Sequence, residues 1–141
     1  MRIRKCARAI IVNECNEILL QKFEFKDVIG NNVLWVTPGG GVKEKETPIE
    51  ALKRELYEEL GIVGDIHEKP LFEIDVLIEG KNDSFISHEI YYKITIQSDT
   101  ILSIENMTKK EKDTFIDLKW WGKEELKKTK NFAPREILNY F

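Results

Sequence analysis

Three glutamates gather near the end of one segment of the chain. The segment 39–62 reads GGGVKEKETPIEALKRELYEELGI and contains Glu55, Glu58 and Glu59. On a helix that turns by about 100° per residue, these three side chains fall within about 100° of one another. Like charges three or four residues apart destabilise a helix by about 0.2–0.5 kcal/mol per pair, and the helix dipole disfavours negative charge near the C-terminus. Another interaction must therefore offset the repulsion between these carboxylates.

A divalent cation is one candidate for that interaction. Clustered carboxylates are hard oxygen ligands that suit Mg²⁺ or Mn²⁺. Mg²⁺ keeps several waters and bridges to phosphate oxygens, so a few carboxylates suffice to hold it. The alternative is a solvated acidic face paired with Lys53 and Arg54. Taken alone, the glutamates favour this alternative.

The glycine run upstream of the glutamates changes that balance. Gly39, Gly40 and Gly41 lie between a predicted strand and the carboxylate-bearing segment. Glycine lets the backbone approach a ligand closely and adopt a positive φ. A run of glycines alone is typical of a plain flexible loop, but its combination with the carboxylates is hard to explain as scaffold. We therefore expect Gly39 and Gly40 to contact a substrate.

The carboxylates are carried by the most clearly marked element in the sequence, a helix predicted over 48–60. Thr47 is a good N-cap, Pro48 suits the first helical position, and Glu50 completes a capping box. Gly61 is placed to end the helix in the left-handed conformation. Apolar residues recur at helical spacing beside the carboxylates and predict a buried stripe: Ile49, Leu52, Leu56 and Leu60.

The rest of the pattern predicts strands joined by few helices. Alternation with β-branched residues indicates a hairpin of strands 3–12 and 18–23. Repeated strand–helix–strand units are too few for a doubly wound fold. We therefore expect an α+β fold, a mixed sheet between helices in an α/β/α sandwich, as one domain over residues 1–141. The other predicted strands cover 34–36, 71–78, 85–96 and 115–121, the other helices 123–128 and 134–141, and a loop covers 24–33.

Composition and charge limit the classes of function. The chain has 141 residues and a net charge of −3, which argues against binding a nucleic acid polymer. The lysines within 109–112 are interrupted by acidic residues and are read as a solvated loop. Cys6 and Cys15 show neither a CxxC pair nor a zinc-type spacing, so we expect reduced thiols and a cytoplasmic protein. The apolar run Ala9–Val12 is too short for a signal-peptide core, and no stretch approaches the roughly 20 apolar residues of a membrane span.

Read in order, the residues of this segment resemble a known motif. Gly40 is followed by five residues, Glu46, seven more residues and then RELYEELGI over 54–62. This pattern resembles a complete Nudix box, so the chain is identified as resembling the Nudix hydrolase family. The flanking LWVTPGG and the order of predicted elements are also similar to the family. The resemblance implies a mixed sheet between helices, and hydrolysis of a nucleoside diphosphate linked to another group X with Mg²⁺ or Mn²⁺.

The resemblance also implies roles for individual residues. The backbone carbonyl of Gly40 and the side chains of three glutamates would hold the metal: Glu55, Glu58 and Glu59. Arg54 would orient these glutamates through charge-assisted hydrogen bonds. Glu46 would have a structural role, closing the loop onto the helix.

The identity of the general base stays open at this point. Attack of water on a pyrophosphate phosphorus builds negative charge that bound metals neutralise, and a carboxylate can take the proton. Members of the family differ in which glutamate does this, some using one in the box and others one in a later loop. Glu55 or Glu58 would serve within the box, and Glu105 or Glu111 in the segment 103–113. Among the later residues we expect Glu111.

Two further residues, Arg8 and Trp35, are candidates for substrate contacts. Arg8 shares a predicted strand face with apolar residues and would either contact a phosphate or extend to the sheet edge. Trp35, just before the glycines, would stack on a base or pack in the core. His88 is expected to be a half-buried sheet residue, and His67 a surface residue.

The motifs that mark particular Nudix substrates are mostly absent. The NADH-type array, the coenzyme A motif, the downstream proline of ADP-ribose hydrolases and the tyrosine of dinucleoside-polyphosphate hydrolases have no clear counterpart. We expect a small-molecule nucleotide substrate, a nucleoside triphosphate or a modified nucleotide. The alternatives are an ADP-ribose, nucleotide-sugar or dinucleoside-polyphosphate hydrolase, and a non-catalytic nucleotide-binding module. A homodimer is common in such families, and no membrane partner is expected.

Overall fold

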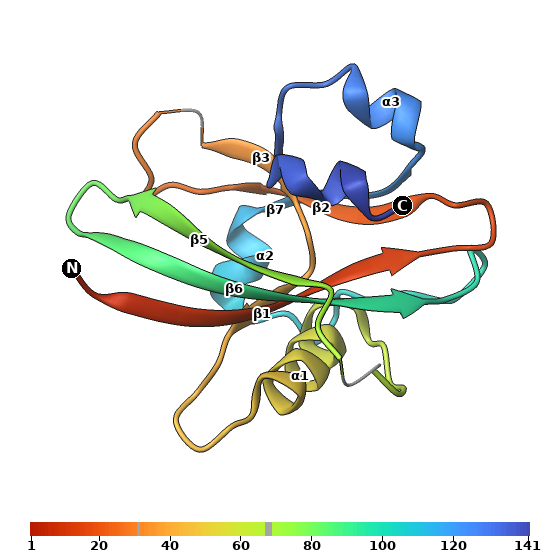
Figure 1. The fold of residues 1–141 in the computed structure, drawn as a ribbon, viewed down its shortest axis with the longest axis horizontal. Helices are drawn as coiled ribbons and strands as arrows, with labels where there is room; N and C mark the ends of the chain where they lie inside the picture. The colour runs from red at the N-terminus through yellow and green to blue at the C-terminus, as the bar shows by residue number, and fades with distance from the viewer. Residues whose placement is uncertain (31, 67–68) are drawn as a thin grey trace.

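The chain forms a large sheet with a few short helices around it (Figure 1). The computed structural model describes residues 1–30, 32–66 and 69–141. Asn31, in the predicted turn, and His67 fall outside these residues. The strands are β1 (Ile3–Val12), β2 (Ile18–Glu24), β3 (Val33–Val36), β4 (Gly39–Gly41), β5 (Phe72–Glu79), β6 (Ser84–Thr95), β7 (Phe115–Trp121) and β8 (Phe132–Ala133). The helices are α1 (Pro48–Leu60), α2 (Lys109–Thr114), α3 (Lys123–Lys127) and a 3₁₀ helix, η1 (Arg135–Asn139).

Helix α1 begins and ends at the predicted residues. The Thr47 hydroxyl accepts a hydrogen bond from the Glu50 backbone N–H (3.2 Å), and the Glu50 carboxylate accepts one from the Thr47 backbone N–H (2.9 Å). Both halves of the predicted capping box are therefore present. Gly61 ends the helix with φ of 69°, a left-handed conformation that glycine adopts without a steric cost.

The three glycines do not form the plain flexible loop that a glycine run alone suggests. Gly39–Gly41 is a short strand, β4, which pairs antiparallel with β1 and sets Gly41 opposite Cys6 and Gly39 opposite Arg8. Glycine is unfavourable in a strand on propensity alone. Pairing is nevertheless possible because the open edge of β1 supplies the hydrogen-bonding partners, a long-range contact that the local sequence does not reveal.

Two predictions for the C-terminal half also need correction. The solvated loop expected around residues 109–112 is helix α2, which begins after Thr108 and has its own capping box with Glu111. The local sequence Thr-Lys-Lys-Glu carries this signal. The helix expected over 134–141 is only the 3₁₀ helix η1, which stops at Asn139.

The sheet is mixed and lies between helices, as the predicted α+β fold requires. Strand β1 pairs parallel with β6 and antiparallel with β2 and β4. On one face, Leu52 and Leu56 of α1 pack in a cluster with Ile11 of β1. On the other face, Leu126 of α3 and Ile137 of η1 belong to a second cluster. Figure 1 shows α1 on one side of the sheet and α3 on the other.

One backbone segment joins β3, which pairs with β2, to β4, which pairs with β1. The hairpin strands β1 and β2 pair at Val12 and Ile18, next to their turn. Beyond that point, β3 pairs antiparallel with β2, and β4, which starts three residues after β3 ends, pairs with β1. We call Thr37–Gly39 the crossover segment. It places the N-terminus of the glycine strand beside α1.

The described part of the chain contains no helix with both the length and the apolar character needed to cross a membrane. Cys6 is buried, Cys15 is exposed, and neither forms a disulfide.

We expect Leu52→Ala to lower the free energy of unfolding by about 2–5 kcal/mol, because Leu52 is fully buried and its loss leaves a cavity under α1. Leu77→Ala is the matched control, since Leu77 is 54% exposed on β5 and should change stability by less than about 0.5 kcal/mol. Urea unfolding measures both. Equal losses for the two variants would contradict the assigned packing of α1.

Candidate functional site

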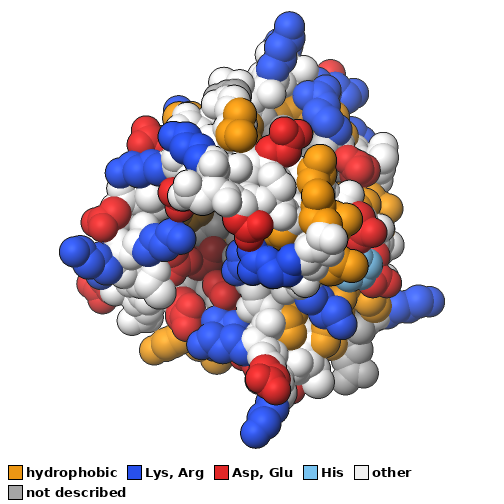
Figure 2. All heavy atoms as spheres, turned by 90° about the vertical axis from the view of Figure 1, so that its left-hand side faces the viewer, with side chains coloured by type: hydrophobic (Ala, Val, Ile, Leu, Met, Phe, Trp, Pro, Cys, Tyr) orange, Lys and Arg blue, Asp and Glu red, His pale blue; other side chains and the backbone are white. Residues whose placement is uncertain are grey.

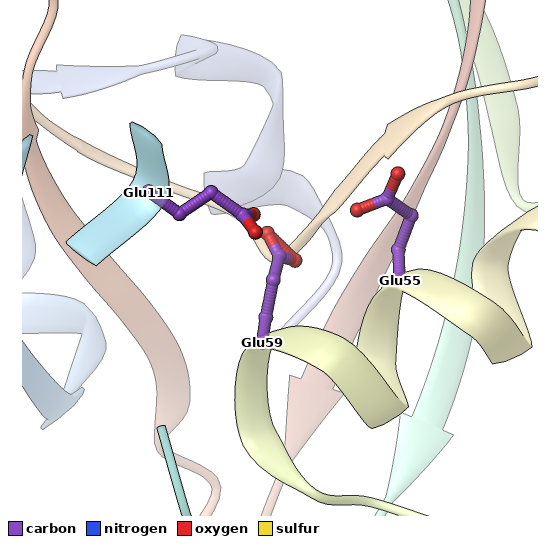
Figure 3. Close-up of side chains that lie close together, drawn as sticks. All are labelled: Glu55, Glu59 and Glu111. Carbon is purple, nitrogen blue, oxygen red and sulfur yellow. The ribbon is translucent and has the colours of Figure 1, made fainter. Parts of the chain in front are cut away.

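Three carboxylates from two helices converge at one place, which we call the acidic cluster. Glu55 and Glu59 extend from α1 and Glu111 extends from α2, and each offers an oxygen such that these atoms all lie within 4.8 Å of one another. Figure 3 shows the three side chains directed toward one another. Figure 2 shows a hollow that contains acidic side chains and has lysine and arginine side chains beside it.

Each helix fixes its carboxylates through local structure. Glu55 and Glu59 are one turn apart, so they lie on the same side of α1, next to the leucine stripe that anchors this helix. Glu111 occupies the third position of α2. Its carboxylate accepts a hydrogen bond from the Thr108 backbone N–H (2.9 Å), and its own N–H donates to the Thr108 hydroxyl (3.2 Å). The capping box therefore orients the Glu111 side chain.

Burial makes the acidic cluster electrostatically costly. Glu59 is only 3% exposed, and its carboxylate accepts a hydrogen bond from the Gly39 backbone N–H (3.0 Å). Burial, followed by the charge of Glu55, raises the pKa of Glu59 well above its ordinary value. Burial also raises the pKa of Glu55, although Arg54 acts against this shift. The site therefore favours either protonation of these carboxylates or the binding of a cation.

Arg54 connects the helix to the loop before it. Its guanidinium donates two hydrogen bonds to Glu46 (2.8 and 2.9 Å), one to the Glu55 carboxylate (2.9 Å) and one to the Gly41 carbonyl (3.0 Å). The hydrogen bonds from Arg54, with one from the Lys43 backbone N–H, lower the pKa of Glu46 to about 2. Arg54 therefore holds Glu55 in place beside the glycine strand.

The glycine strand lies very close to its neighbours at two positions. A Cβ atom built on Gly40 would lie 2.6 Å from the carboxylate of Glu55. A Cβ atom on Gly39, whose φ is 137°, would lie 2.2 Å from the carbonyl oxygen of Ala7. The sequence analysis predicted close approach of these glycines to a substrate; the described contacts are with the protein's own Glu55 and Ala7.

Two candidate glutamates lie outside the acidic cluster. The Glu58 side chain is 29% exposed, and its nearest cationic group is the Arg54 guanidinium at 3.6 Å. Glu105 is exposed, before α2. The structure therefore brings together Glu55, Glu59 and Glu111 of the predicted residues, whereas Glu58 does not contribute an oxygen within the same distances.

Arg8 contacts the crossover segment, and Trp35 packs on another tryptophan. The Arg8 guanidinium donates to the carbonyls of Thr37 (3.2 Å) and Gly39 (3.3 Å). Trp35 is 8% exposed and packs edge to face on Trp121, with ring centres 5.1 Å apart. Substrate contacts by either side chain stay a prediction.

Strand β6 carries polar groups on both faces. His88 is half-buried, and its ring nitrogens contact Asp75 (2.6 Å) and Glu73 (2.9 Å), which together raise its pKa. On the opposite face, Glu89 is 7% exposed and accepts hydrogen bonds from Ser87 (3.0 Å) and Tyr91 (2.8 Å). Sequence reasoning missed this carboxylate, because its face of the strand also carries Lys93 and Thr95 and so looked polar.

A separate groove of about 540 Å³ lies between α1 and the segment after it. Its lining includes Lys53, Tyr57 and Ile66, but none of the acidic cluster. The candidate site is therefore the cluster and not this groove.

Comparison with curated proteins finds relatives across part of the chain. An 8-oxo-dGTP diphosphatase of Haemophilus influenzae is 42% identical over 76 residues, which cover 51% of this chain and 54% of that protein. An RNA pyrophosphohydrolase of Bartonella clarridgeiae is 36% identical over 67 residues, 39% of each protein. The matched segments thus span about half of these relatives or less.

Comparison with solved structures extends over nearly the whole chain. A MutT protein from Methanosarcina mazei Go1 aligns with a TM-score of 0.71 at 23% identity, covering 98% of this chain and 91% of that one. A MutT Nudix hydrolase from Burkholderia pseudomallei aligns with a TM-score of 0.70 at 22% identity, covering 99% and 98%. These similarities show the fold. The sequence model of the NUDIX domain matches residues 2–141, and the chain therefore belongs to the Nudix family.

Proposed function

We propose that this protein is a metal-dependent pyrophosphohydrolase that cleaves a nucleoside diphosphate linked to another group X. The favoured substrate is a nucleoside triphosphate or a modified nucleotide. The observation that carries the proposal is the convergence of Glu55, Glu59 and Glu111 from two helices at a buried site. A family member that only bound nucleotides would not need this costly arrangement.

The donor set fits a hard divalent cation. Three carboxylates with oxygens within 4.8 Å of one another supply the ligand type that Mg²⁺ and Mn²⁺ prefer. Arg54, which forms an ion pair with Glu55 in the acidic cluster, is already shared with Glu46. We propose that Glu55 and Glu59 hold Mg²⁺ or Mn²⁺, with Gly40 and Glu58 kept as predicted ligands, while Glu111 beside them accepts a proton. When bound, such a cation neutralises charge on phosphate oxygens and acidifies water.

The protein's own residues have the following proposed roles in catalysis and in positioning. Glu111 is the proposed general base, because it faces Glu55 and Glu59 from another helix and is half-buried. Arg54 holds Glu55 and closes the loop through Glu46. The Gly39 N–H holds Glu59. The side-chain-free backbone at Gly40 leaves room for the Glu55 carboxylate.

The names of the relatives support two substrate types. The Haemophilus influenzae relative is an 8-oxo-dGTP diphosphatase, which supports a modified nucleoside triphosphate. The Bartonella clarridgeiae relative is an RNA pyrophosphohydrolase, which supports a 5′-triphosphate at an RNA end as the second candidate. The net charge of −3 favours the small nucleotide. A homodimer and a cytoplasmic location stay predictions.

A hydrolysis screen tests the proposed function. It compares dGTP, 8-oxo-dGTP, the other nucleoside triphosphates, ADP-ribose, nucleotide sugars, a dinucleoside polyphosphate and a 5′-triphosphorylated RNA, each with Mg²⁺, Mn²⁺ or EDTA. We expect release of pyrophosphate from a nucleoside triphosphate only with metal, and its loss in Glu55→Gln. If only the 5′-triphosphorylated RNA were hydrolysed, the second candidate substrate would be the correct one. Nucleotide binding without any turnover would overturn the enzyme in favour of a sensor.

We expect Glu111→Gln to lower kcat by about 10²–10⁴-fold, because glutamine cannot accept the proton of the attacking water. Glutamine can still complete a capping box, so α2 should stay folded. Glu105→Gln is the matched control, since Glu105 is exposed and outside the acidic cluster. Steady-state kinetics with the screened triphosphate measure both variants. Full activity in Glu111→Gln would exclude this residue as the base.

We expect Glu59→Gln to stabilise the metal-free protein at neutral pH. The pKa of Glu59 is raised on folding, so the folded state binds more protons than the unfolded chain. Stability is therefore highest below the unfolded pKa and falls as pH rises toward the folded pKa. In EDTA at about pH 7.5 the variant should unfold at a temperature at least about 2 °C higher than wild type, and the difference should shrink near pH 4.

Calorimetry with and without Mn²⁺ checks this expectation. Mn²⁺ should raise the unfolding temperature of wild type and have less effect on Glu59→Gln, since ligand binding stabilises only the state that binds it. Glu105→Gln should behave as wild type in both conditions. A variant less stable than wild type at neutral pH would show that burying the Glu59 charge is not the dominant cost.

A further inference from the structure

The Arg8 side chain holds the crossover segment from the sheet face opposite α1. Its neighbours on β1, Ala7 and Ala9, belong to the apolar cluster beneath α1, so Arg8 points to the other face. There its guanidinium donates to the carbonyls of Thr37 (3.2 Å) and Gly39 (3.3 Å). The backbone N–H of Ala9 donates to the carbonyl between them, that of Pro38 (2.9 Å). All three carbonyls of the crossover segment are thus bound from β1.

A buried carboxylate lies beside the Arg8 guanidinium. Glu89 lies on β6, and its side chain is 10% exposed, against 24% for Arg8. One of its oxygens is 3.8 Å from Arg8 Nε, and its two oxygens accept hydrogen bonds from Ser87 (3.0 Å) and Tyr91 (2.8 Å). The parallel register of β1 and β6 places Tyr91 opposite Arg8. Removing one partner of such a pair leaves a buried charge uncompensated.

The crossover segment is held from both faces at one residue. The Gly39 carbonyl accepts from Arg8 (3.3 Å), and the Gly39 N–H donates to Glu59 of the acidic cluster (3.0 Å). A displacement of this residue toward either face changes both hydrogen bonds. The contacts therefore run from Glu89 through Arg8 and Gly39 to Glu59, across the sheet.

We propose that Arg8 and Glu89 are positioning residues, which fix Gly39 so that the Glu59 carboxylate is oriented within the acidic cluster. This inference rests on the proposed function, since it assigns the pair a role toward the cation site. Outer partners that orient the ligands of a metal typically change metal affinity or activity by about 10–100-fold when they are altered. Arg8 thus acts through backbone atoms. A direct phosphate contact by Arg8 is the competing role.

The test compares three variants in the full chain. Arg8→Lys keeps the charge but cannot present one nitrogen to the two carbonyls, as Nη1 does, and another to Glu89, as Nε does. Glu89→Gln keeps the shape but loses the charge. Arg2→Lys is the matched control, because Arg2 also lies next to β1 but pairs with Asp83 at an exposed position. Three quantities are measured: the Kd for Mn²⁺ alone by electron paramagnetic resonance, the ¹H–¹⁵N signal of the Gly39 amide in EDTA, and the Kd for dGTP in EDTA.

For Arg8→Lys and Glu89→Gln we expect the Kd for Mn²⁺ to rise by about 10-fold and the Gly39 amide signal to shift. The Kd for dGTP without metal should stay close to wild type, and Arg2→Lys should leave all three quantities unchanged. Weaker dGTP binding with unchanged Mn²⁺ affinity would assign Arg8 to the substrate and overturn the proposal. Lower thermal stability without any change in Mn²⁺ affinity or in the Gly39 signal would also overturn it.

The two hypotheses fail in different ways. Absence of metal-dependent turnover in the wild-type protein would defeat the proposed function. An unchanged Gly39 amide in Arg8→Lys would defeat the positioning role, because this signal depends on neither metal nor turnover.

Discussion

The structure depends on how the backbone is held between β3, which pairs with β2, and β4, which pairs with β1. At the crossover segment, carbonyl groups are bound from β1 and the Gly39 N–H is bound by Glu59. A buried backbone group without a partner costs free energy comparable to a lost hydrogen bond, so these contacts fix the path of the chain closely. The glycine strand, the start of the loop that Arg54 closes and the acidic cluster all follow from that path.

The same region concentrates negative charge against its local stability. Glu55 and Glu59 are buried or half-buried on one side of α1, and Glu111 adds a third carboxylate. The two caps of α1 and the leucine stripe stabilise the helix independently of these charges. A well-anchored helix can therefore carry residues that repel one another, which a marginal helix could not.

The sequence predicted α1, its caps and most strands because their signals are local. The cluster member Glu111 was chosen only by its position after the box, while the capping box of Thr108, which reveals α2, went unread. Alternation placed Arg8 on the correct face but could not name Glu89 as its partner, because pairing of β1 with β6 joins residues about 80 positions apart. The strand formed by Gly39–Gly41 has the same cause: its partner is β1, and propensity alone argues against it.

The glycine strand also restricts how proteins with this architecture can diverge. A side chain at Gly39 would meet the Ala7 carbonyl, one at Gly40 the Glu55 carboxylate, and one at Gly41 the Arg4 guanidinium. Gly39 is closed to single mutations, because its neighbour is backbone and its φ is 137°, whereas the neighbours of Gly40 and Gly41 are the ends of side chains that can move. Inherited variation in what the site accepts must therefore arise at positions other than Gly39. The backbone at Gly39 would change least among related proteins, while the residues around it could change with the ligand.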